Sequence, residues 1–319
     1  RPPFTGSYDN WFTCGEGAAI RTELWACLAA GDPDLAAAYA HADACFDHDG
    51  DGILAAQFLA RLQSLAFVES DPDTLLDTAL AGIPADSAIH RVVQDTRAWL
   101  AETGDWQEVQ RRIVAAYGNS DFTDVRPNTG FVVLGWLAGA DFSERICITN
   151  NCGLDCDSTT ASIGALLGIL DPDGIPERWL APIGRDLVLN AEVTGIDPPA
   201  TLELFTDLVL DLRDRLDGSG PVQLGTGFDP AAHEIEVGLA WYNTSFGKWE
   251  IRDHTELPPV GGTLPQGLEW APGRLPGTWV RWNREDFADR VLFVKYQIDC
   301  AGRRDLRLMV NSTEHYRVW

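Results

Sequence analysis

Two carboxylates and two hydroxyls lie within five consecutive residues near the middle of the chain, in the segment NCGLDCDSTTASIGALLGIL. They belong to Asp155, Asp157, Ser158 and Thr159, and an apolar run of helical character follows them. A single such side chain would be enough to cap that helix. A second Asp two residues away adds repulsion that a cation would offset, and hard divalent cations prefer carboxylate and hydroxyl oxygens. The spacing therefore fits either a strong helix cap or a metal-binding loop.

A glycine-rich turn near the start of the chain is a second candidate. Gly15, Glu16 and Gly17 precede the apolar run AAIRTELWACLAA. Glycines ahead of a helix expose backbone N–H groups, which can bind an anion. The same pattern also occurs at helix starts that bind nothing, so the turn by itself indicates only where a helix begins.

The acidic loop DACFDHDGDG matches the first half of a calcium-binding loop. The twelfth position of such a loop would be Phe58, where calcium sites need a bidentate Glu. We therefore predict no calcium site there. His48, inside this loop, is interpreted either as a residue of a ligand cleft or as a solvent-exposed loop histidine.

These candidates are embedded in a mainly helical sequence. From about residue 17 to residue 217, apolar residues recur at intervals of three and four, with Gly, Pro or Asp at the joins. Beyond DGSGP come short β-branched and aromatic runs, separated by Pro/Gly loops: EIEVGLAWY, TWVRW, RVLFVKYQI and DLRLMV. We predict a mainly α domain over residues 1–217, followed by an all-β, sandwich-like module over residues 218–319.

The composition limits the partners and the compartment. Asp and Glu number 48 against 24 Lys and Arg, a formal charge of -24. Such a surface repels phosphate backbones and anionic lipids, so we predict neither a nucleic-acid nor a membrane partner. The seven cysteines lack zinc-type spacing, and several, including Cys27, Cys45 and Cys147, lie in apolar helical patterns. They predict reduced, buried thiols and a cytoplasmic protein.

Four segments resemble a known family when they are taken together. GLDCDSTTASIGALLGIL, followed by IPERWLAPIG, resembles the C-terminal signature of the ADP-ribosylglycohydrolase family, where G-x-D-x-D-T leads into a helix of small residues. CGEGAAIR is similar to the family's N-G-A-A-M-R helix start, and GDPDLAAAYAHADACFDH to its G-D-P helix and T-H loop. NTGFVVLGWLAGADFSERICITNNCG resembles the helix pair before the signature. The motifs keep the family's order over about residues 8 to 200.

The resemblance implies a compact helical fold with two divalent ions, usually Mg²⁺ and alternatively Mn²⁺, in a cleft that hydrolyses the bond to C1″ of a ribose. The matching metal ligands are Asp155, Asp157 and Ser158, with Ser in place of Thr. The family's other acidic ligands, including a Thr/Ser-Asp-Asp motif, come from an N-terminal segment with no equivalent here. We expect that segment, and the catalytic acid within it, upstream of Arg1 or on a partner chain.

The resemblance also implies a set of substrate contacts, which are Gly15, Glu16, Gly17, His48, Asn128, Asn151 and Gly153. In the family the glycine turn lies against the ligand's phosphates, but Glu16 stands where many relatives have Asn. Asn128 and Asn151 each precede a small-residue helix, so capping is the alternative role for both.

We therefore expect a metal-dependent glycohydrolase that cleaves an N- or O-glycosidic bond at C1″ of a ribose. The substrate would be an ADP-ribosylated protein or a smaller nucleotide-like molecule. The alternative is a non-catalytic binding protein whose β-module recognises a glycan or a partner. Aromatic residues that pack a sandwich core would explain the tryptophan-rich tail equally well.

Overall fold

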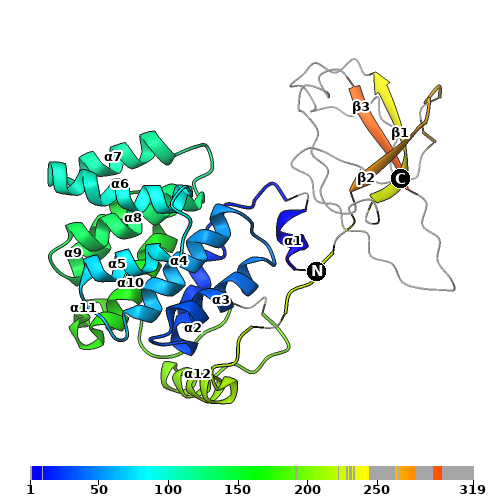
Figure 1. Ribbon diagram of the computed structural model, residues 1–319. Helices are drawn as coiled ribbons and strands as arrows, with labels where there is room; N and C mark the ends of the chain where they lie inside the picture. Colours follow the sequence, from blue (N-terminus) through cyan, green and yellow to red (C-terminus); the bar gives the residue numbers. More distant parts are fainter. Residues whose placement is uncertain are drawn as a thin grey trace. The chain divides into compact units, whose positions relative to one another are not determined.

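The computed structural model describes residues 2–8, 10–190, 193–221, 223–227, 229, 232, 234–243, 263–264, 266–276 and 290–296. The chain divides into two compact units, Arg1–Thr226 and Gly227–Trp319. Helices make up the first unit and strands the second (Figure 1). The helices are α1 (Phe4–Ser7), the 3-10 helix η1 (Ala19–Arg21), α2 (Thr22–Leu28), α3 (Pro33–Ala44), α4 (Asp51–Leu65), α5 (Pro72–Ala81), α6 (Ala88–Thr103), α7 (Trp106–Tyr117), α8 (Val125–Ala138), α9 (Phe142–Asn151), α10 (Cys156–Leu170), the 3-10 helix η2 (Pro172–Gly174), α11 (Glu177–Leu180) and α12 (Leu202–Leu216).

Helices α4 and α8 form the centre of the helical unit. Helix α4 packs against α2, α3, α5 and α8 (Figure 1). In α8 every residue from Pro127 to Trp136 is buried, as expected of a helix that is apolar on all sides. Gly135 lets α9 approach closely, because a Cβ there would lie 1.8 Å from Oγ1 of Thr149. The small residue Gly135 in α8 therefore allows α9, the helix that leads into the Asp155 loop, to pack closely.

Two apolar clusters stabilise this unit. The larger one joins α4 to α10 and includes Phe58, Phe131 and Trp136. The smaller one lies between α2, α3 and α4 and consists largely of alanines, with Leu212 and Leu216 of α12 packed against it. Because alanine adds little bulk, α3 and α4 can pack closely. Helix α4 contributes to both clusters and is therefore packed on two sides. The predicted mainly helical fold is confirmed.

Aspartates start most of the longer helices. At α3, α5, α7, α8 and α9 an Asp side chain accepts a hydrogen bond from a backbone N–H of the first turn; these caps are Asp32, Asp71, Asp105, Asp124 and Asp141. Each such cap stabilises its helix by about 1 kcal/mol. Much of the acidic composition therefore has an ordinary structural role.

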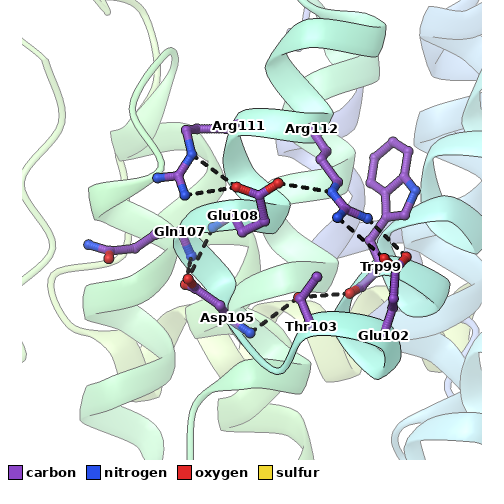
Figure 2. A network of polar contacts seen from close by, with 8 residues as sticks. All are labelled: Trp99, Glu102, Thr103, Asp105, Gln107, Glu108, Arg111 and Arg112. Atoms are coloured by element: carbon purple, nitrogen blue, oxygen red, sulfur yellow. Dashed lines mark hydrogen bonds and ion pairs between the residues drawn. The ribbon is translucent and has the colours of Figure 1, made fainter.

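The corner between α6 and α7 shows how these caps work with surface ion pairs (Figure 2). Gly104 ends α6 in the left-handed region with a φ of 62°, and Asp105 then accepts from the N–H groups of Gln107 and Glu108. Arg112 bridges Glu102 and Glu108 at 2.9 and 3.1 Å. Exposed ion pairs contribute only about 0.2–1 kcal/mol each, so the glycine and the cap determine the corner.

The second unit contains a three-stranded antiparallel sheet in the order β2-β1-β3. The strands are β1 (Glu234–Asn243), β2 (Ala271–Pro276) and β3 (Arg290–Tyr296). The predicted strands EIEVGLAWY and RVLFVKYQI correspond to β1 and β3. The sequence did not predict β2, which contains two prolines; it lies at the edge of the described sheet, where proline is tolerated. TWVRW and DLRLMV lie outside the described residues, and the sandwich stays a prediction.

The cysteines are only partly as predicted. The six described cysteines are all free, and Cys45 and Cys152 are buried. Cys147 is exposed on α9, so its predicted burial is wrong. The apolar pattern around Cys147 belongs to the neighbouring positions Ile146 and Ile148, which are buried. Among the described residues no helix has the length and apolarity needed to span a membrane.

Candidate functional site

Asp155 differs from the other N-terminal aspartates of the long helices. It is the N-cap residue of α10, which begins at Cys156, yet its side chain makes no capping hydrogen bond. The preceding residues Gly153 and Leu154 both have positive φ values, 83° and 56°. A left-handed conformation costs a non-glycine residue such as Leu154 about 1 kcal/mol. The backbone of this loop is therefore strained at Leu154. The Asp155 carboxylate, which does not bond to the helix, is available to contact another residue.

That partner is Glu16, in the glycine-rich turn. The Glu16 side chain lies within hydrogen-bonding reach of Asp155, and both Asp155 and Asp157 act on it electrostatically. The two loops meet because α10 packs against η1, which directly follows the glycine turn. Glu16 is 4% exposed, whereas Asp157 in the first turn of α10 is exposed. The fold therefore joins the two candidate segments into one acidic site.

Burial and the neighbouring carboxylates change the protonation of Glu16. Loss of hydration, followed by the hydrogen bond to Asp155 and the charges of Asp155 and Asp157, raises the pKa of Glu16 to about 10. Without a cation Glu16 is therefore protonated at neutral pH and can donate its proton to Asp155. A cation bound between the carboxyl groups would favour the ionised form instead.

The fit of a divalent ion can be tested on two features of this site. Oε2 of Glu16 is buried and finds no hydrogen-bond partner among the described residues, and the Asp155 carboxylate is free of its helix. Both are oxygen ligands of the kind that Mg²⁺ prefers. Within the described part of the chain, however, no three His, Cys, Asp or Glu side chains are grouped so that they could hold an ion. These residues fit one part of a metal site.

The glycine turn is fixed at its N-terminal end. Gly15 forms an isolated antiparallel bridge with Asp124, and the N–H of Val125 donates to the carbonyl of Cys14 at 2.8 Å. A Cβ at Gly15 would lie 2.5 Å from the ring of Phe12, so a larger residue here would displace that ring. The turn is thereby held against the start of α8, with Glu16 directed toward α10.

Asp124 is the anchor of that contact and was not predicted. Its buried carboxylate accepts hydrogen bonds from Nδ2 of Asn119 at 2.6 Å and from the backbone N–H and the guanidinium of Arg126. Burial raises the pKa of Asp124, but the hydrogen bonds from Arg126 and Asn119 outweigh it and hold the pKa below its ordinary value. Asp124 thus stays ionised and keeps the glycine turn in place.

His48 lies on the other side of the turn. It is 4% exposed, so the interpretation of a solvent-exposed loop histidine is wrong. Its Nδ1 is 2.6 Å from Oδ1 of Asp47. A Cβ at Gly17 would lie 3.0 Å from Cε1 of the His48 ring, so glycine is what allows the ring to lie against the turn. The structure therefore brings together the glycine turn, His48 and Asp155.

The asparagines have other surroundings. Asn128 is fully buried in α8, and its Nδ2 donates to the carbonyls of Phe122 and Asp124, both at 2.9 Å. The capping role considered for Asn128 is wrong, because Asp124 caps that helix. Asn151 is the exposed last residue of α9, and it does not cap α10 either. Substrate contacts by Asn128, Asn151 and Gly153 stay predictions, and so does metal binding by Ser158.

The sequence showed Glu16 without revealing its role. Its signal was an acidic residue between two glycines, and that residue argued only against phosphate binding. Pairing with Asp155 depends on how α10 packs against η1, which no local pattern encodes. Asp47 contacts His48, and Arg21 binds Asp47 and the glycine turn. No sequence pattern indicated these contacts.

Comparison with known proteins identifies a family. The family model of the ADP-ribosylglycohydrolases matches residues 1–215, which contain the glycine turn, His48 and the Asp155 loop. No curated protein and no solved structure matches the chain. The matched region covers more than half of the 319 residues. The chain therefore belongs to the ADP-ribosylglycohydrolase family, a family of hydrolases.

Proposed function

We propose that this chain acts as a metal-dependent glycohydrolase that cleaves an N- or O-glycosidic bond at C1″ of the ribose in an ADP-ribosylated or nucleotide-like substrate. The observation that supports this most directly is the meeting of Glu16 and Asp155. Asp155 occupies a capping position without capping, and it faces a buried acid from a distant loop. Such an arrangement is unfavourable in a merely structural site and favourable beside a cation.

Asp155, Asp157 and Ser158, with Glu16 opposite them, are the residues that would hold Mg²⁺ or Mn²⁺. A bound divalent ion would supply Lewis-acid polarisation and a lower pKa for a coordinated water. The chain's own residues would orient the ribose. The glycine turn would offer its backbone N–H groups, and the ring of His48 lies beside Gly17. Further acidic ligands would come from a partner chain or an upstream segment.

A release assay tests this proposal. The full chain is incubated with one peptide carrying N-linked ADP-ribose and one carrying O-linked ADP-ribose, with Mg²⁺ or with EDTA, and free ADP-ribose is measured. With a segment carrying a Thr/Ser-Asp-Asp motif supplied, we expect Mg²⁺-dependent release that Asp155→Asn and Asp157→Ala reduce to background. Asp141→Ala is the matched control, because Asp141 caps α9 and has no contact with the site. Release that survives in EDTA or in Asp155→Asn would refute the proposal.

The second candidate is a binding protein without turnover. It is favoured by the lack of a complete three-ligand group within the described part of the chain. Calorimetry with ADP-ribose distinguishes the two functions. Binding without release, also after a segment carrying a Thr/Ser-Asp-Asp motif is supplied, would indicate a binding protein. Release that appears only when that segment is supplied would indicate an enzyme completed in trans.

A further inference from the structure

A charged network behind His48 is not explained by the metal site. Arg21, which ends η1, holds the carboxylate of Asp47 with two hydrogen bonds, from Nη2 to Oδ1 at 2.7 Å and from Nη1 to Oδ2 at 3.1 Å. The same guanidinium binds Asp43 through Nε at 2.6 Å and the carbonyl of Gly17 through Nη1 at 2.8 Å. Arg21 therefore connects the glycine turn directly to the residue that contacts His48.

The Asp47 carboxylate can only accept hydrogen bonds. Burial raises the pKa of Asp47, but the hydrogen bonds from Arg21 and His48 outweigh this and lower it overall. Asp47 is thus ionised, and the contact of 2.6 Å with Nδ1 of His48 requires a proton on Nδ1. In a neutral imidazole the other nitrogen, Nε2, then carries a free lone pair.

The surroundings of the ring keep it from turning away. A Cβ at Gly52 would lie 3.1 Å from Cδ2 of His48, and one at Gly17 would lie 3.3 Å from Nε2. The ring is therefore enclosed between two glycines, with its Nε2 edge toward the glycine turn. Nε2 is buried and has no hydrogen-bond partner among the described residues. A buried polar atom of this kind lacks the partner that a ligand could supply.

We propose that Asp47 and Arg21 are positioning residues, which fix His48 as its Nδ1-protonated tautomer so that Nε2 accepts a hydrogen bond from a hydroxyl group of the substrate. The ligand class is a hydroxyl-bearing sugar, and its assignment as ribose rests on the proposed function. In the other tautomer the proton is on Nε2, which would then donate a hydrogen bond to an acceptor such as a phosphate oxygen. Asp47 thereby selects between hydroxyl and phosphate recognition at this position.

The tautomer can be measured without any turnover. Long-range ¹H–¹⁵N correlation spectra of the full chain distinguish protonated from unprotonated ring nitrogens, and the His48→Gln variant assigns the His48 signals. We expect Nδ1 protonated and Nε2 unprotonated in the wild type. In Asp47→Ala we expect the Nε2-protonated form, which predominates in free histidine. A wild-type ring with its proton on Nε2 would overturn the proposal, and so would an unchanged tautomer in Asp47→Ala.

Ligand affinity gives a second readout. Calorimetry with ADP-ribose should show binding about tenfold weaker in Asp47→Ala, the loss of roughly one hydrogen bond. Asp43→Ala is the matched control: Asp43 binds the same guanidinium but does not contact His48, so its affinity and tautomer should be those of the wild type. An equal loss in both variants, or no binding by the wild type, would overturn the ligand assignment. Failure of Mg²⁺-dependent release would count against the proposed function alone.

Discussion

The carboxyl group of Glu16 lies within hydrogen-bonding reach of that of Asp155, and the two residues come from loops that are far apart in the sequence. Neither loop makes a complete site by itself. The contact depends on α10 packing against η1 and on the bridge between Gly15 and Asp124, which holds the glycine turn. A substitution that weakens either of these two contacts should therefore separate Glu16 from Asp155.

Asp155 should be dispensable for stability even though it occupies a capping position. Because its side chain makes no capping hydrogen bond, Asp155→Asn should leave the free energy of unfolding within about 0.5 kcal/mol of the wild type. The new amide can also donate to Glu16, which would act in the stabilising direction. Urea unfolding followed by helical circular dichroism measures the change.

The comparison variant is Asp141→Ala, which removes the side chain that accepts from the N–H of Glu144 at 2.8 Å. It should cost about 1 kcal/mol. If Asp155→Asn destabilised the chain as much as Asp141→Ala, Asp155 would be an ordinary cap and the metal-site interpretation would lose its main support.

Asp124 should make the helical unit sensitive to acid. Its pKa lies below the ordinary value of 3.8, so its contribution to stability is present above pH 3.8 and is lost as the pH falls through the lower, folded-state pKa. Asp124→Asn should therefore cost about 1–3 kcal/mol at pH 7, because it weakens the ion pair with Arg126 and the cap of α8.

Unfolding of the two proteins in urea at pH 7 and at pH 3 measures this difference. The gap between wild type and Asp124→Asn should shrink at the lower pH. A gap of the same size at both values would show that the charge of Asp124 does not contribute to stability.

Two glycines of the helical core should respond in opposite directions to alanine. Gly135→Ala places a Cβ 1.8 Å from Oγ1 of Thr149, which is fully buried, so it should cost about 2–3 kcal/mol. At Gly164 in α10 the nearest atom to a new Cβ is Cδ1 of Ile146 at 3.6 Å, an ordinary contact. Gly164→Ala should therefore stabilise by about 0.5–1 kcal/mol, the usual gain in a helix interior.

Thermal unfolding of both variants tests the packing of α8, α9 and α10. Equal effects at the two positions would mean that α8 and α9 do not approach one another at Gly135. In that case α9, which leads into the Asp155 loop, would pack against α8 at a different position from the one described.

The sequence by itself determined the helical character of the first unit. The three- and four-residue periodicity and the Asp caps are local signals, since each depends on residues within one or two turns. The start of α10 next to Asp155 followed from the same kind of signal, as did the strands β1 and β3. The family motifs added the order of the segments and the hydrolase class, because each motif is itself a short, local pattern.

Tertiary structure alone decided which of these residues meet. Whether Asp155 is a cap or a ligand could not be read from its spacing, because both roles use the same residue at the same helix position. The fold shows that the Asp155 side chain does not cap α10 and lies next to Glu16, a residue far away in the sequence that contacts Asp155 only when α10 packs against η1. The protonation of Glu16 and the tautomer of His48 follow in turn from burial and from neighbours on other elements. Burial and long-range contact are properties of the packed chain, and for that reason no local pattern contains them.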